Sequence, residues 1–137
     1  MPKFNNLRDL EKHLKKASDA LLTEVIVTTQ GRIGSEAISP VQTGRLRSSW
    51  FASEGSPSDA VPPEGANSPN TDATGLKVDS DKKYFLTSNL PYTQRVALEG
   101  HVVNKPITWF VSLMNEGVPK IAAEAAEVVK KRFDLGR

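Results

Sequence analysis

The chain has 137 residues and a formal net charge of +2, from 18 Lys and Arg against 16 Asp and Glu. This length suits one ordinary domain with a sizeable core, and so small a charge excess does not by itself favour a nucleic-acid binder. Cysteine is absent, which excludes disulfides, thiolate metal sites and thiol catalysis. We expect a single domain over 1–137, with no membrane-spanning segment or signal peptide.

The first segment predicts a long helix that Pro40 ends. Apolar residues recur at steps of three and four and so share one face. The predicted stripe comprises Leu7, Leu10, Leu14, Ala17, Leu21, Val25 and Thr28. On the outer face, Glu11 and Lys15 are spaced for an i,i+4 ion pair, and His13 is expected in solvent.

Two segments show the two-residue alternation of half-buried strands. The first follows a turn between Pro40 and Gly44 and runs to about Ala52. One of its faces carries Leu46, Ser48 and Trp50, and the other carries Arg45, Arg47 and Ser49. The second strand covers 84–89, and 76–78 is a further strand candidate.

The segment from Glu54 to Gly75 differs in kind, because it is rich in proline and glycine and holds no Lys or Arg. Its acidic residues are Glu54, Asp59, Glu64 and Asp72. So little apolar area cannot offset the entropy cost of ordering the segment. We therefore predict a long acidic loop that is mobile in the free protein and orders against a partner.

The remaining segments are helical, apart from 101–106. Asn89-Leu90-Pro91 predicts the start of a short helix that Gly100 ends, and 101–106 is expected to form an edge strand or hairpin. A second long helix begins near residue 109, with a kink or break expected near Gly117 and Pro119. These elements indicate an α+β fold, in which a small antiparallel sheet packs against long N- and C-terminal helices.

Few residues suggest catalytic or metal-binding chemistry. No phosphate loop, dinucleotide fingerprint, GxSxG elbow or HExxH helix occurs, and neither histidine has a second ligand at i+3 or i+4. Ser48 and Ser49 lack an identifiable base, so structural roles are favoured over a nucleophile. Asp79 and Asp81 are better explained as a solvated turn than as a metal site. We predict neither an enzyme nor a bound cofactor or metal.

Two arginines remain as candidate binding residues. Arg45 and Arg47 would share one face of the predicted strand, where they would either grip phosphates or partner carboxylates or simply be solvated. Together with the basic run Lys130–Arg132 they define an alternative function, a small nucleic-acid-binding module. This alternative lacks aromatic stacking platforms and a strong basic patch.

Two motifs carry a resemblance to a known family. Residues 40–50 read PVQTGRLRSSW, and residues 91–100 read PYTQRVALEG. They resemble the Pro-Val-x-Thr-Gly-x-Leu-Arg-x-Ser and Pro-Tyr-Ala-x-x-Val-Glu-x-Gly segments of the small tail-completion proteins of tailed bacteriophages, also called neck or head–tail joining proteins. The matching positions are Pro40, Val41, Thr43, Gly44, Leu46, Arg47, Ser49, Pro91, Tyr92, Val96 and Gly100. Thr93 replaces the usual alanine, and Glu99 lies one or two positions late.

The resemblance implies a non-enzymatic virion protein of the neck or the top of the tail, assembled in the host cytoplasm. Copies would form a homo-oligomeric ring, of six or twelve subunits, through which DNA passes without specific binding. The expected neighbours are a tail-terminator or tail-tube protein and the head-completion or connector proteins, with no membrane partner. The motif residues would be structural, with Leu46 and Trp50 pointing inward and Pro91 starting a helix. We place the assembly contacts at Arg45, Arg47, Glu54, Asp59, Glu64 and Asp72.

Overall fold

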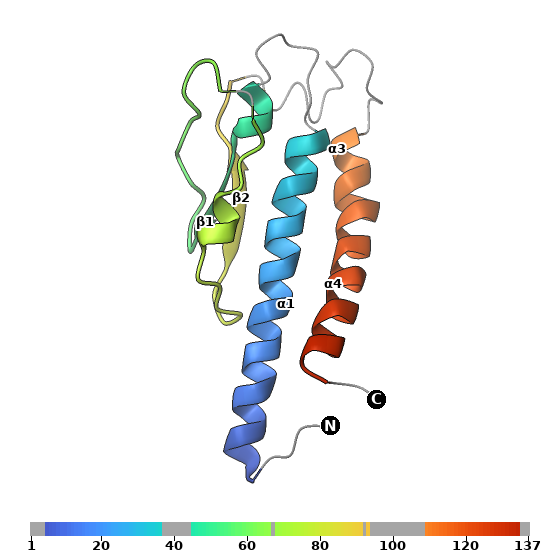
Figure 1. Cartoon of the computed structure of the whole chain (residues 1–137). Coiled ribbons are helices and arrows are strands. Elements are labelled where there is room, and N and C mark those ends of the chain that lie inside the picture. Colours follow the sequence, from blue (N-terminus) through green and yellow to red (C-terminus); the bar gives the residue numbers. More distant parts are fainter. Residues whose placement is uncertain (1–4, 37–44, 67, 92, 94–108, 135–137) are drawn as a thin grey trace.

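The computed structural model describes residues 5–36, 45–66, 68–91, 93 and 109–134. Its elements are the helix α1 (Leu7–Glu36), the 3-10 turn η1 (Arg45–Ser48), the strand β1 (Trp50–Glu54), the 3-10 turn η2 (Asp72–Gly75), the strand β2 (Tyr84–Ser88), the helix α3 (Trp109–Ser112), the π-helical turn η3 (Leu113–Gly117) and the helix α4 (Val118–Arg132). Two long helical segments pack with a two-stranded antiparallel sheet, which confirms the predicted α+β class (Figure 1).

The sheet is a single hairpin-like pair, in which Trp50 lies opposite Ser88 and Glu54 lies opposite Tyr84. Side chains alternate between the faces of a strand, so Trp50 and Leu86 share the face that packs toward the helices. The prediction for the second strand is confirmed, whereas 76–78 is not a strand. An isolated pair of strands is marginal in water, so this sheet depends on the helices for its stability.

The strand predicted over 45–52 is wrong in its first half, because residues 45–48 form η1 instead. Serine hydroxyls explain the difference. Ser48 Oγ donates to the carbonyl of Arg45 at 2.9 Å, and Ser49 Oγ donates to the carbonyl of Leu46 at 2.7 Å. These local bonds satisfy carbonyls that a strand would pair with a neighbour, so they favour a tight turn.

Helix α1 is confirmed, but its buried face differs from the predicted stripe. The exposed residues include Leu7, Leu14 and Thr28, which the stripe had placed inside. The buried residues are Ala17, Ala20, Ile26, Thr29, Gln30, Ile33 and Gly34. The reason is that α1 has two partners: α4 along its first half, and the sheet with η1 and η2 along its second half. The buried face therefore shifts along the helix.

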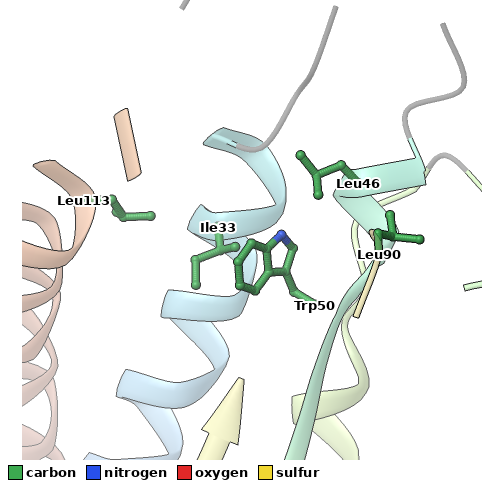
Figure 2. Packing of buried hydrophobic residues seen from close by; sticks show 5 residues of the cluster. All are labelled: Ile33, Leu46, Trp50, Leu90 and Leu113. Atoms are coloured by element: carbon green, nitrogen blue, oxygen red, sulfur yellow. The ribbon is translucent and has the colours of Figure 1, made fainter. Parts of the chain in front are cut away.

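The main core lies where α1, η1, the sheet and the start of the last helix meet. Its buried members are Ile33, Leu46, Trp50, Leu90 and Leu113 (Figure 2). Leu46 is only 1% exposed, and the Trp50 ring stacks on that of Phe110 with centroids 5.6 Å apart. The inward positions predicted for Leu46 and Trp50 are confirmed.

A smaller core joins the first half of α1 to the end of α4. Ala17, Ala20 and Val129 are its buried members. His13 lies at its edge, where its Nε2 is 2.9 Å from the carbonyl oxygen of Phe133 and its ring meets the Phe133 ring edge-on. The expectation that His13 is solvated is therefore wrong, because the end of α4 covers it.

The kink expected near Gly117 and Pro119 takes the form of η3. Proline has no N–H to donate and its ring crowds the carbonyl four residues earlier, so a wider turn accommodates it. Gly117 contributes as well, because a Cβ there would lie 2.7 Å from Leu113 Cδ1. The helix widens at this point and continues as α4.

The first part of the proline-rich segment 54–75 runs along the outside of the sheet, and its last part, which includes η2, packs against β1 and α1 (Figure 1). The Asn89 side chain donates to the carbonyls of Ser58 and Ala60 at 2.8 and 3.0 Å. Pro69 packs against α1 at Gly34, where a Cβ would lie 2.9 Å from the Pro69 ring. These contacts give the segment fixed points on the body, and its mobility between them stays a prediction.

Candidate functional site

The two edges of the sheet differ in how their backbone groups are satisfied. On β1, the carbonyl of Trp50 accepts a bond from Gln30 Nε2 at 3.0 Å, and the N–H of Ala52 donates to Asp72 Oδ1 at 3.1 Å. Both groups therefore point away from β2, and α1 and η2 cover them. The outer edge of β1 is closed by the chain itself.

None of the described residues covers the outer edge of β2. In an antiparallel pair, residues alternate between facing the partner strand and facing outward. Trp50 and Ala52 face outward, so the residues opposite them, Ser88 and Leu86, face outward as well. Tyr84 follows in the same alternation. Among the described residues, no group hydrogen-bonds to the outward backbone N–H or C=O of these three.

An apolar cleft of about 270 Å³ lies beside this edge. Its wall residues include Ile26 and Ile33 of α1, Trp50 and Leu86 of the sheet, and Phe110 and Met114 of the last helical segment. Phe85 also lines the cleft, although the strand alternation directs its side chain to the opposite face. The cleft therefore reaches the backbone edge of β2.

Two buried polar atoms at the cleft have no hydrogen-bond partner in the described structure. They are Thr29 Oγ1 and Trp50 Nε1, and both residues line the cleft. Leaving such a group unpaired in the interior costs about 1–3 kcal/mol. Because both atoms are themselves buried, they are not presented to the open space of the cleft, whose walls are mainly apolar.

The described parts of the two sequence motifs meet at one end of the sheet. Ser49, which is fully buried, shares a hydrogen bond of 2.6 Å with Ser88, and Ser88 shares one of 2.8 Å with Thr93. Leu46 of the first motif packs in the same cluster as Leu90. The Ser49 and Ser88 hydroxyls therefore join segments about 40 positions apart.

Other motif residues lie outside the described residues. These are Pro40, Val41, Thr43, Gly44, Tyr92, Val96 and Gly100, together with the predicted turn at 40–44, most of the short helix over 91–100, and the edge strand or hairpin over 101–106.

The candidate arginines do not form the predicted pair on a strand face. Arg45 donates from Nε and Nη2 to the carbonyl of Pro62, at 3.2 and 2.8 Å, and so holds the acidic segment. Arg47 is half-buried, and its Nε has no partner in the described structure. The 3-10 geometry of η1 separates the two side chains, because alternate residues share a face in a strand but not in a helical turn.

The four acidic candidates are all exposed, but they differ in their contacts. Asp59 and Glu64 lie on the proline-rich segment and are available to a partner. Asp72 bonds to Gln30 and Ala52 through Oδ1, which anchors η2 to α1 and β1. Glu54 Oε1 lies 3.4 Å from Lys82 Nζ at the end of β1.

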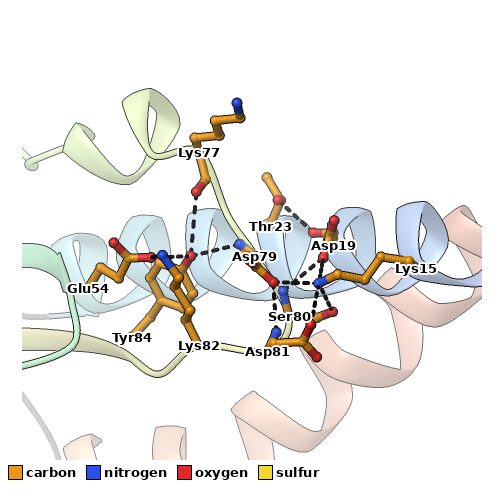
Figure 3. A network of polar contacts seen from close by, with 10 residues as sticks. All are labelled: Lys15, Asp19, Thr23, Glu54, Lys77, Asp79, Ser80, Asp81, Lys82 and Tyr84. Atoms are coloured by element: carbon orange, nitrogen blue, oxygen red, sulfur yellow. Dashed lines mark hydrogen bonds and ion pairs between the residues drawn. The ribbon is translucent and has the colours of Figure 1, made fainter. Parts of the chain in front are cut away.

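Sequence reasoning missed a polar network that docks the turn before β2 onto α1 (Figure 3). Lys15 Nζ bonds to Asp19 at 2.8 Å, to Asp79, and to Ser80 Oγ at 3.0 Å, and it lies 3.3 Å from Asp81. Lys15 therefore pairs with Asp19 and not with the expected Glu11. The turn expected at Asp79 and Asp81 is present and Asp81 is largely exposed, but both carboxylates also contact Lys15. Their charges surround an ammonium group, and no described cluster has the three ligands that a metal needs.

This network shifts the ionisation of its members. The hydrogen bond from Lys15 lowers the pKa of Asp19 to about 2, and a bond from the Ser80 N–H adds to the effect. The same lysine lowers the pKa of Asp79, and the pKa of Lys15 is raised, chiefly by Asp19. All three groups are therefore charged across the neutral range. No local signal revealed the network, because Lys15 and Asp79 lie 64 positions apart.

Comparisons with protein-family models, with curated proteins and with solved structures find no match to this chain. In the part of the chain that the structure describes, no helix is both long and apolar enough to cross a membrane.

Proposed function

We propose that this protein is a structural component of a tailed-bacteriophage virion, which forms a ring in the neck or at the top of the tail and completes the tail for joining to the head connector. The observation that carries the proposal is the pair of sequence motifs at 40–50 and 91–100, of which the structure describes 45–50, Pro91 and Thr93. Ser49 and Leu46 of the first motif meet Ser88, Leu90 and Thr93 around the second.

The fold supports this assignment in two ways. The order helix–strand–strand–helix is the skeleton that the resemblance implies. Leu46, Ser48, Ser49 and Trp50 of the first motif are buried, as expected of a motif that maintains a scaffold, whereas Pro91 of the second is exposed. The role is non-enzymatic: subunits associate around a lumen that DNA passes through without specific binding, between tail-tube or terminator proteins and head-completion or connector proteins.

The alternative, a small nucleic-acid-binding module, has less support. Its central pair was Arg45 and Arg47, and Arg45 is already engaged with the Pro62 carbonyl. The basic run at the end of α4 is placed to stabilise the helix dipole, and Arg132 lies over the Phe133 ring at 5.4 Å.

An amber mutation in the gene tests the assignment in the phage or prophage that encodes this chain. We expect the mutant to accumulate filled heads and separate tails, which join when the purified protein is added, and immunogold to label the neck of wild-type virions. Normal virions from the mutant, or label absent from virions, would contradict the proposal.

A pair of charge variants locates the contact surface. Asp59→Asn combined with Glu64→Gln removes two exposed acids from the proline-rich segment, and Glu124→Gln combined with Glu127→Gln removes two exposed acids from α4. Both double variants should keep the wild-type melting temperature, since exposed positions contribute little to stability. We expect the first to slow head–tail joining in the complementation assay and the second to leave it unchanged.

A further inference from the structure

We propose that the open edge of β2 and the apolar cleft beside it form an acceptor site for one extended segment of a different protein, which adds to the sheet as a third strand. This inference goes beyond the virion assignment and does not depend on it. It rests on three features of the described residues: the direction of the backbone groups, the shape of the cleft and the charge at one end of β2.

The backbone determines what kind of ligand the edge accepts. Outward N–H and C=O groups at Tyr84, Leu86 and Ser88 alternate at the spacing of a β-ladder. Only an extended polypeptide offers donors and acceptors at that spacing, and strand addition of this kind is a common mode of peptide recognition. The β1 edge cannot serve in the same way, because Gln30 and Asp72 already occupy it.

The cleft accounts for the side chains of such a strand. A strand paired with β2 directs every second side chain toward the helices, between the sheet and the wall formed by Phe110 and Met114. The volume of about 270 Å³ is slightly below the range of about 300–1,000 Å³ that is usual for small-molecule sites. It suits a few apolar side chains at alternate positions better than a complete small ligand.

The charge at the start of β2 favours an incoming segment with an acidic residue at that end. Lys82 and Lys83 immediately precede β2, and both are exposed. Lys82 lies 3.4 Å from Glu54 on β1, whereas Lys83 has no such partner in the described structure. Opposite charges on neighbouring strands stabilise their pairing, so the incoming segment should carry a carboxylate beside Lys83.

A second copy of this chain is a poorer occupant. Outside β1 and β2, the described residues contain no other strand to donate, so a copy would have to offer its own β2. The helical wall at Phe110 and Met114 stands across the cleft from β2. A single strand passes between that wall and β2 more readily than a second sheet with its own helices.

The test begins with amide hydrogen exchange on the free protein. Phe85 and Thr87 face β1 and should be protected, whereas Leu86, which faces outward, should exchange at least about tenfold faster. If Leu86 is as protected as Phe85 at every protein concentration, a segment of the same chain covers the edge. If its protection rises with concentration, a second copy does. Either result overturns the proposal.

The second step is selection from a displayed library of random octapeptides. We expect enriched peptides with apolar residues at alternate positions and an acidic residue near one end, which protect the amides of Leu86 and Ser88. N-methylation of the peptide groups that face β2 should weaken binding at least about tenfold, because it removes two or three hydrogen bonds. N-methylation of the groups between them is the matched control and should change affinity less than about threefold.

Failure to enrich any peptide, or peptides that protect other amides, would overturn the acceptor site. Equal effects of the two methylation patterns would do the same, because strand pairing must distinguish them. None of these results bears on the amber-mutant experiment, so the acceptor site and the virion assignment fail separately.

Discussion

Gln30 shows how one side chain can organise several segments. It is 1% exposed on α1, and its amide bonds to the Trp50 carbonyl, to the Asp72 carboxylate and, through Oε1, to the Ala73 N–H. Both amide hydrogens and the amide oxygen are therefore used. A buried amide with this degree of satisfaction fixes the positions of α1, β1 and η2 relative to one another.

Replacing Gln30 with Leu should lower the free energy of unfolding by about 2–4 kcal/mol, because the partners in β1 and η2 lose their hydrogen bonds in the interior. Urea denaturation measures the change. The control Thr28→Ala, at an exposed position of the same helix, should alter stability by less than about 0.5 kcal/mol. Equal effects of the two substitutions would mean that Gln30 does not hold η2.

Leu46 provides a test of the core. Leu46→Ala should cost about 2–5 kcal/mol, since it removes buried methyl groups from a tightly packed cluster. Leu7→Ala is the matched control, because Leu7 is 69% exposed and its truncation should cost little. A negligible shift in melting temperature for Leu46→Ala would show that η1 does not pack as described.

At the scale of elements, the sequence predicted which segments are helices or strands better than it predicted which face of each is buried. Both long helices and β2 follow from simple periodicity and were anticipated. The pattern at 45–50 suggested a strand because Leu46, Ser48 and Trp50 alternate with other residues in the sequence, but serine hydroxyl bonds close residues 45–48 into a turn. The α1 stripe assumed one partner along the whole helix, whereas α1 packs against two.

The candidate site could not be predicted from local sequence patterns, because it also depends on contacts between distant segments. Its open edge is defined by which backbone groups Gln30 and Asp72 cover, and these residues are 42 positions apart in the sequence. Its cleft is formed by α1, the sheet and the last helical segment together. Neither periodicity nor a short motif reports on such an arrangement.

The polar network at Lys15 makes the docking of the turn before β2 dependent on pH. The pKa of Asp19 is lowered from 3.8 to about 2, so its stabilising contribution is present above about pH 4 and is lost as the pH falls toward 2. Lys15→Met should therefore lower the melting temperature at neutral pH, and its difference from wild type should shrink between pH 4 and 2.

Lys16→Met removes the same charge from an exposed neighbouring position and serves as the control. It should leave the acid dependence of the melting temperature as in the wild type. Salt should also reduce the effect of Lys15→Met, since the groups are partly exposed and the interaction is screened. A Lys15→Met deficit that persists undiminished at pH 2 would contradict the ionic origin.

At the scale of the whole molecule, the proline-rich segment is a −4 appendage on a body of opposite sign. Its contacts with the body are concentrated at few positions: Asn89 and Arg45 hold its first part, and Gln30 and Gly34 contact its last part. Glu64 lies between these anchors and is exposed. We predict that the segment is most mobile there.

A glutamate-specific protease tests this prediction directly, because trypsin has no site in the segment. We expect the first cut of the native protein after Glu64, well before any cut after Glu124 in α4. Mass spectrometry of early fragments identifies the site. If Glu64 is cut no faster than Glu124, the segment is held along its length, and it would present its acids as a fixed surface.

The π-helical turn at Leu113–Gly117 has a consequence for how this chain tolerates insertions and deletions. Each residue of an α-helix advances the face by about 100°. The wide turn lets Phe110 stack on the sheet while Val129, on the same continuous helix, packs against α1. Removing one exposed residue of the turn would leave α3 and α4 helical but would rotate α3 relative to α4. The Trp50–Phe110 contact would then be lost, although neither Trp50 nor Phe110 is changed.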